Sequence, residues 1–124
     1  MGYRDMYDSV LGGHIINSNN SDNMDADVIS DVVLISKKKC IGIQIDVDNT
    51  DAVGVINIQQ CIDIDRTNWV DVTLIDGSTS VAVESGVDLH LLYDLAYLGG
   101  RYLRAFYDRT SGNGKIDVYC EVKD

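Results

Sequence analysis

The chain has 124 residues, a net charge of -10 at pH 7 and an isoelectric point of about 4.3. This length fits one domain with its own core, and no stretch approaches the ~20 apolar residues of a membrane-spanning helix. The acidic composition argues against a duplex-binding surface, which needs clustered basic residues, and the basic run Lys37–Lys39 is interpreted as a solvated turn. We therefore expect no nucleic-acid partner and no membrane partner. The first ten residues lack the apolar core of a signal peptide, so synthesis in a cytoplasm is expected.

Residues 1–26 differ from the rest of the chain, because they show no sustained period of either helix or strand. Such a composition is typical of a flexible arm. The sequence therefore divides into an N-terminal arm over residues 1–26 and a folded domain over residues 27–124. The apolar residues that would hold the arm in place are Val10, Leu11, Ile15 and Ile16. Two interpretations stay open: neighbouring subunits hold the arm as an assembly device, or the arm docks on its own domain.

From Val28 onward the sequence alternates apolar and polar residues, which is the side-chain period of half-buried strands. Residues 87–98 also carry apolar residues at helical spacing, but a strand over 88–92 is favoured there. Strands are predicted over 28–35, 40–47, 54–64, 69–75, 79–84, 88–92, 101–108 and 115–122. In the second of these the apolar face consists of Ile41, Ile43, Ile45 and Val47, and in the last it consists of Ile116, Val118, Cys120 and Val122.

Turns that contain glycine separate the later strands. Asp76–Ser78 is a hairpin signal. The short loop 110–114 would let the strands over 101–108 and 115–122 pair antiparallel with each other. About eight short strands in a chain without proline predict an all-β fold, an antiparallel β-sandwich or jelly roll with an N-terminal arm.

Metal-binding and catalytic side chains form no recognisable motif in the sequence. The stretch 46–51 resembles a calcium loop, but it lacks the glycine at the sixth position and the glutamate at the twelfth, so an EF-hand is excluded. A calcium site at a sandwich edge, with Asp46, Asp48 or Asp51 as ligands, stays open. Asp63 and Asp65 share a strand face, as an acid–base pair could, but they also flank a turn, where aspartate is expected.

The remaining candidate ligands are also isolated. His14 and His90 have no partner at metal-ligand spacing. Cys40, Cys61 and Cys120 lie on predicted strands and are interpreted as buried free thiols. We therefore predict a protein that is not an enzyme and has no cofactor.

Trp69 and two arginines are the candidate binding residues outside the arm. Trp69 follows a polar turn, where it could stack on a sugar ring, although a single tryptophan also commonly packs at the end of a core. Arg101 and Arg104 lie within an apolar strand. They could pair with Asp108 or Asp117, or contact the acidic surface of a neighbouring subunit.

Five short segments stand out: Asp51–Gly54, Ile58–Asp63, Asn68–Val72, Gly100–Arg104 and Ser111–Ile116. Together they resemble a group of small β-sandwich proteins encoded by tailed bacteriophages. In that group an Asp-Gly-x-Asn-Trp-Val turn precedes one strand and a Gly-Arg-Tyr-Leu-Arg strand precedes a glycine-rich hairpin. Here Arg66 stands where glycine is common. The resemblance covers residues 27–123 and implies a virion structural protein with a sandwich or jelly-roll fold and no catalytic residues.

The sequence therefore predicts a phage virion structural protein, in particular a capsid decoration (cement) subunit that stabilises the particle through its arm and sheet contacts. Its expected partners are the major capsid protein or other virion subunits. A homo-oligomer, with a trimer favoured, is expected because oligomers adopt closed symmetry. A tail, collar or fibre component is the alternative within the virion. A carbohydrate- or receptor-binding module that uses Trp69 is the alternative outside it.

Overall fold

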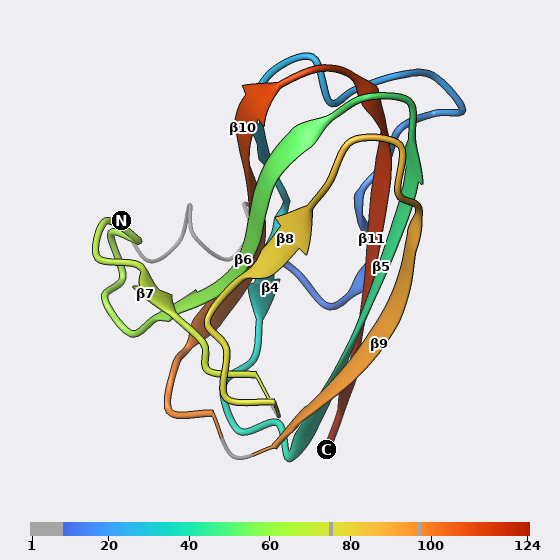
Figure 1. Cartoon of the computed structure of the whole chain (residues 1–124). Coiled ribbons are helices and arrows are strands. Elements are labelled where there is room, and N and C mark those ends of the chain that lie inside the picture. The colour runs from blue at the N-terminus through green and yellow to red at the C-terminus, as the bar shows by residue number, and fades with distance from the viewer. Residues whose placement is uncertain (1–8, 75, 97) are drawn as a thin grey trace.

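The computed structural model describes residues 9–74, 76–96 and 98–124, and these residues form eleven strands and no helix. The strands build two sheets that face each other across a shared apolar core, which confirms the predicted all-β fold (Figure 1). No helix that could span a membrane occurs among them. Sheet A contains β1 (Ser9–Val10), β3 (Val28–Ile29), β4 (Val32–Leu34), β6 (Val53–Cys61), β7 (Val70–Asp71), β8 (Val81–Val83) and β10 (Tyr102–Ser111). Sheet B contains β2 (Gly13–Ile16), β5 (Cys40–Asn49), β9 (Leu89–Ala96) and β11 (Gly114–Lys123).

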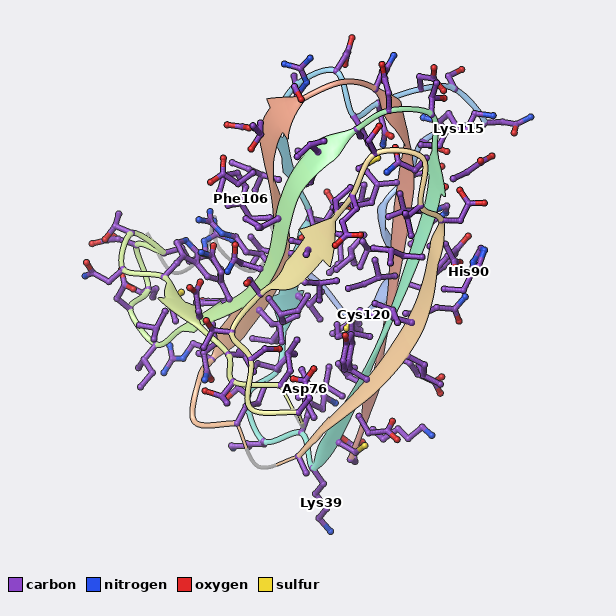
Figure 2. All side chains as sticks on the ribbon, in the orientation of Figure 1. Lys39, Asp76, His90, Phe106, Lys115 and Cys120 are labelled. Carbon is purple, nitrogen blue, oxygen red and sulfur yellow. The ribbon has the colours of Figure 1, made fainter. Side chains whose placement is uncertain are left out.

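The core consists of the inward faces of the long strands. Sheet B contributes Ile41, Ile43, Ile45 and Val47 from β5 and Ile116, Val118 and Cys120 from β11, as the alternation predicts. Sheet A contributes Ile56, Ile58, Leu103, Ala105 and Tyr107. Figure 2 shows Cys120 between the sheets and His90 pointing outward from sheet B. The ambiguous stretch 87–98 contains the strand β9 rather than a helix.

Several predicted strands end earlier than their sequence period suggests. The strand over 28–35 is split into β3 and β4 at Ser30, whose hydroxyl accepts a hydrogen bond from the Ala105 N–H at 2.8 Å. The strand over 54–64 ends at Cys61, so Ile62 and Ile64 are exposed instead of buried. The strand over 69–75 shortens to β7, and Ile75 lies outside the described residues.

The hairpin signal at Asp76–Ser78 produces a turn but not a hairpin. The Gly77 N–H donates to the Leu74 carbonyl at 2.9 Å, which closes the turn. The flanking strands β7 and β8 do not pair with each other. Each pairs antiparallel with a different part of β6.

The predicted pairing of the last two strands is wrong, because β10 and β11 lie in different sheets. β11 pairs with β5 over ten residue pairs, and β10 pairs with β6 over nine. Paired residue numbers add to the same total in both ladders, as for Cys40 with Lys123 and Cys61 with Tyr102, apart from a one-residue shift at Ser111. The two ladders therefore form one long antiparallel ribbon that bends from sheet B into sheet A.

The ribbon bends at a corner where the β5–β6 and β10–β11 connections cross between the sheets, at the top of Figure 1. The Asp51 N–H donates to the Asn113 carbonyl at 3.0 Å, and the Asn113 N–H donates to the Asp51 carboxylate at 2.8 Å. Gly112 lies between β10 and β11 with a φ of 78°, and a Cβ there would overlap the Asp51 carbonyl. Only glycine fits this close approach without strain.

Asn49 joins the corner to the β8–β9 connection. Its side-chain N–H2 donates to the carbonyls of Glu84 at 2.6 Å and Ala52 at 3.1 Å, and its side-chain oxygen accepts from the Ala52 N–H at 2.7 Å. Its backbone N–H donates to the Asp88 carboxylate at 2.8 Å. Since Asn49 and Ala52 are both buried, the Asn49 side chain supplies hydrogen bonds that the Ala52 backbone groups need away from water.

The described part of the expected N-terminal arm, residues 9–26, packs on the rest of the chain. β2 pairs with β11 at one edge of sheet B, and Ile15 and Ile16 are each only 3% exposed in the shared core. Met24 is fully buried, and the Asn23 side chain bonds both backbone groups of Ile116. Ile15 and Ile16 are therefore core residues of this chain, as expected from the interpretation in which the arm docks on its own domain. They are apolar because they complete the domain's own core.

Val10 and Leu11 differ from those two isoleucines. Val10 is half-buried in the short parallel pair β1–β4 and packs against the core. Leu11 is 71% exposed. Of the four apolar residues assigned to the arm, Leu11 is thus the one with an accessible side chain. Residues 1–8 lie outside the described part of the chain.

Replacing Asn49 by alanine is expected to lower the free energy of unfolding by about 2–3 kcal/mol, because the Glu84 carbonyl and the Ala52 backbone groups lose buried partners. Urea denaturation measures this change. Asn57→Ala is the matched control, since the Asn57 side chain makes one exposed hydrogen bond, to the Thr79 carbonyl. Its loss should stay within about 1 kcal/mol. Equal losses in the two variants would show that Asn49 does not hold the corner.

Candidate functional site

The candidate site lies where β6 ends and the loop 62–69 turns back toward β7. Asp63 organises this loop, because its carboxylate accepts hydrogen bonds from the Thr67 N–H at 2.9 Å, the Thr67 hydroxyl at 3.0 Å and the Asn68 N–H at 3.4 Å. The bond from the Thr67 N–H is the main cause that lowers the pKa of Asp63 below its ordinary value. Asp63 therefore serves as a capping group of the loop, and its turn position agrees with the sequence interpretation.

Arg66 occupies the turn of the loop in a left-handed conformation, with a φ of 54°. Its carbonyl accepts a hydrogen bond from the Trp69 indole N–H at 2.8 Å, and its guanidinium lies 5.5 Å from the centre of the Tyr102 ring. A left-handed backbone favours glycine. The left-handed backbone of Arg66 gives a physical reason why glycine is common at this position in the phage proteins that the sequence resembles.

Trp69 and Arg104 meet on the outer side of sheet A. The Arg104 guanidinium lies 4.3 Å from the centre of a Trp69 ring, which is a cation–π contact. Arg104 also donates from Nε to the Gln59 side-chain oxygen at 2.9 Å, and Gln59 donates to the Asp71 carboxylate at 3.1 Å. The strand register explains this row, because Gln59 of β6 lies between Arg104 of β10 and Asp71 of β7.

This contact changes the interpretation of both residues. Trp69 is half-buried, with one ring face covered by Arg104, so it is neither a core residue nor a fully open platform for a sugar. Arg104 contacts Trp69 and Gln59 instead of Asp108 or Asp117. Arg101 does not join the row, and its side chain is exposed.

An apolar depression of about 460 Å³ lies where β6 ends, lined in part by Gln60, Cys61 and Val70. Ile62 and Val70 line it and are 67% and 63% exposed, and Ile64 of the same loop is 42% exposed. Gly99 and Gly100 form its far side, where the Gly100 N–H donates to the Gln60 side chain at 2.9 Å. A Cβ at Gly100 would lie 2.7 Å from that side-chain oxygen, so glycine permits the close approach. This depression is not among the sites predicted from the sequence, although the apolar residue Ile62 just after β6 was a signal for it.

The two histidines, expected to be isolated, each contact an aspartate on the outer side of sheet B. His14 Nε2 lies 2.8 Å from Asp117, and His90 Nδ1 lies 3.2 Å from Asp46. Within the described ranges no group of three potential metal ligands converges. Asp46, Asp48 and Asp51, considered for calcium, are separated: Asp46 contacts Gln44 and His90, whereas Asp51 bonds Asn113 at the corner.

The three cysteines carry free thiols in different surroundings. Burial raises the pKa of Cys120 to about 12. Burial, assisted by the charge of Asp63, raises the pKa of Cys61 to about 11. Cys40, at the start of β5, is only half-buried. A raised pKa keeps a thiol protonated and unreactive at neutral pH, so Cys61 and Cys120 are inert packing residues.

Comparison of the chain with protein-family models, with curated proteins and with solved structures finds no match. The resemblance to phage structural proteins therefore depends on the short segments of the sequence alone. The function has to be argued from the surface of this fold.

Trp69 and Arg104 are expected to stabilise the loop 62–69 as a pair. A double-mutant cycle with Trp69→Ala and Arg104→Ala should give a coupling free energy of about 0.5–2 kcal/mol. Trp69→Ala alone should cost less than the about 3–5 kcal/mol of a fully buried tryptophan, because Trp69 is half-buried. Arg101→Ala, the control, should change stability by less than about 0.5 kcal/mol. A coupling energy near zero would mean that the contact does not stabilise the loop.

The thiols give a prediction about pH. At pH 8 Ellman's reagent should modify Cys40 quickly and Cys61 and Cys120 slowly, whereas all three should react in denaturant. Because the folded pKa of the two buried thiols exceeds the unfolded value of 9.0, the unfolded state loses protons first. The free energy of unfolding should therefore fall as the pH rises above 9.0 toward 11. Rapid native modification of all three would contradict the burial of these thiols.

Proposed function

We propose that this protein is a virion structural protein of a tailed bacteriophage, a capsid decoration subunit that binds the major capsid protein. The observation that carries the proposal is the apolar depression lined by the exposed Ile62 and Val70, which together with the exposed Ile64 of the same loop we name the docking surface. Exposed apolar side chains that gather at a hollow are typical of protein–protein contact sites. The short segments that resemble phage structural proteins border the same place, at 58–63, 68–72 and 100–104.

The docking surface fits a contact in which an apolar side chain of a partner protein is partly buried in the depression. Stable interfaces bury roughly 1,200–2,000 Å² in total, but a few central residues usually supply most of the binding energy. The depression of about 460 Å³ can receive such a residue. Asp63, which lines the depression, and the exposed Arg101 beside Gly100 provide a polar border of both charges.

The proposal has three further parts. The bent ribbon of β5–β11 and β6–β10 favours a jelly-roll description of the two sheets. A homotrimer would present several copies of the docking surface to a capsid lattice. Of the four apolar residues assigned to the arm, Leu11 is the one proposed to contact a neighbouring subunit, because its side chain is exposed. A tail, collar or fibre location remains the alternative within the virion.

The copy number of the chain in purified particles, relative to the major capsid protein, tests the proposed location. Quantitative mass spectrometry of particles from the source of the chain measures it. A copy number comparable with that of the capsid protein is expected for a decoration subunit. A much smaller number would assign the chain to the tail, collar or fibres, and absence from particles would overturn the virion proposal.

Substitution of the docking surface tests the mode of binding. Ile62→Asp with Val70→Asp should weaken binding to particles at least about tenfold, equivalent to about 1.4 kcal/mol. The melting temperature should stay unchanged, because both side chains are exposed. Leu92→Asp is the matched control, since Leu92 is 69% exposed but lies on sheet B. Cosedimentation with particles that lack the protein measures both. Equal binding of the double variant and the control would reject this surface.

A further inference from the structure

A second hollow lies on the outer side of sheet B, away from the docking surface. It consists of two adjoining parts of about 370 and 140 Å³ that share Gln44 and Leu92. The first part extends over β2, β11, β5 and β9, and the second extends along β5 and β9 toward His90. In Figure 2, His90 points outward on this side of the molecule. We name the whole hollow the sheet B groove.

Gly42 forms the floor of the groove, and nothing in the fold requires glycine there. Its φ lies outside the left-handed region, and a Cβ would have only the Glu121 carbonyl near it, at 4.0 Å. Glycine inside a strand weakens the strand, and it often marks a place where a ligand approaches the backbone closely. Gly42 lies in the middle of a three-strand row, between Glu121 of β11 and Asp94 of β9. The missing side chain therefore opens the centre of the sheet surface.

Tyr119 and Leu92 form the two walls. They lie on either side of Gln44 in the next row, so their strands are two strand spacings apart, about 10 Å. His14 stacks on Tyr119 from the opposite strand, β2, with ring centres 4.3 Å apart and planes 19° apart. Because His14 covers the face toward β2, the other face of the Tyr119 ring is directed toward β5 and the groove. Leu92 is 69% exposed and presents an apolar side chain across from that ring.

The position of Tyr119 is fixed through His14, which stacks on it and contacts the Asp117 carboxylate. His14 Nε2 lies 2.8 Å from the Asp117 carboxylate, which also accepts the Ser18 N–H and hydroxyl at 2.9 Å each. Burial alone would raise the pKa of Asp117, but the hydrogen bonds from Ser18 and His14 outweigh it and lower the pKa. The carboxylate therefore stays charged and fixes the imidazole that supports Tyr119. This rigidity is what a preorganised ligand wall needs.

The polar groups around the groove offer both donors and acceptors. Glu121 and Asp46 provide carboxylates, Gln44 provides an amide, and His90 provides an imidazole. Gln44 donates one hydrogen bond to Asp46 at 2.9 Å, which orients its amide. The groove thus combines an aromatic face, an apolar side chain and mixed hydrogen-bonding groups over a glycine floor. An anionic ligand is disfavoured, since carboxylates line the groove and the chain has a net charge of -10.

We propose that the sheet B groove binds a neutral saccharide of two or more units. A sugar ring has an apolar face that stacks on an aromatic ring and hydroxyl groups that need both donors and acceptors. The two adjoining parts of the groove make it longer than one ring site. This proposal is independent of the docking surface, and it uses a different face from that of Trp69.

The test is a titration of the isotope-labelled full chain, followed by amide NMR, with maltose, cellobiose, lactose and N,N′-diacetylchitobiose. At concentrations up to about 10 mM, which reveal a millimolar Kd, at least one of them should shift the amide signals of Gly42, Gln44, Leu92 and Tyr119. Gly42→Val should fill the floor and raise the Kd at least about tenfold. Its melting temperature should equal or exceed that of the unaltered chain, because valine suits a strand and its Cβ would meet only the Glu121 carbonyl, at 4.0 Å. Lys115→Val, on the same side of β11 but outside the groove, should bind like the unaltered chain.

Two results would overturn the proposal. The first is no shift at these amides with any of the four saccharides; shifts produced instead by tetramethylammonium chloride would make the groove a site for cations. The second is unchanged binding by Gly42→Val, which would place the ligand elsewhere.

Discussion

The continuous ribbon formed by β5–β6 and β10–β11 is the constraint on which the rest of the structure depends. Because its register is kept through the corner, the two halves of one antiparallel pair become the central strands of opposite sheets. Six strands are added to the edges of this ribbon: β2 and β9 in sheet B, and β3, β4, β7 and β8 in sheet A; β1 in turn pairs with β4. The corner can bend this sharply because Gly112 permits the close approach to Asp51 and because Asn49 satisfies the backbone groups that the bend removes from the ladders.

The same ribbon makes the two outer faces different. On sheet A, β6 ends at Cys61, and the loop 62–69 folds back so that Trp69 covers Arg104 and Arg66 covers Tyr102. The apolar residues that this loop cannot bury collect at its end as the docking surface. On sheet B none of the described residues forms a comparable loop over β5, and Gly42 and Gln44 line an open hollow. The outer face of sheet A is therefore covered by a loop and has an apolar surface at one end. The outer face of sheet B is open and carries both polar and apolar side chains.

Much of the fold could be predicted from the sequence, because the alternation in 40–47 and 115–122 directly gives the inward face of two central strands. The pairing could not, since a short glycine-rich loop at 110–114 fits both a hairpin and a crossing between sheets. Pairing with strands far away in the sequence decides between these two connections, because β11 pairs with β5 and β10 pairs with β6. The alternation of apolar and polar residues also could not show where β6 ends, because Ile62 and Ile64 continue the alternation after the strand has ended. The Trp69–Arg104 contact joins residues 35 positions apart and depends on the pairing of β10 with β6 and of β6 with β7. It therefore could not be predicted from neighbouring residues in the sequence.

The N-terminal segment shows how composition can mislead about packing. Polar residues such as Asn23 and Ser18 made residues 1–26 look like a flexible arm, yet they bond the backbone of Ile116 and the carboxylate of Asp117. These bonds hold β2 against β11, and β2 in turn holds His14 against Tyr119. The segment therefore supports one wall of the sheet B groove. If the docking surface on sheet A attaches the protein to a capsid, the groove on sheet B is left free, because it belongs to the opposite sheet and depends on none of the docking residues. A single subunit could then stabilise a particle with one sheet and bind a saccharide with the other.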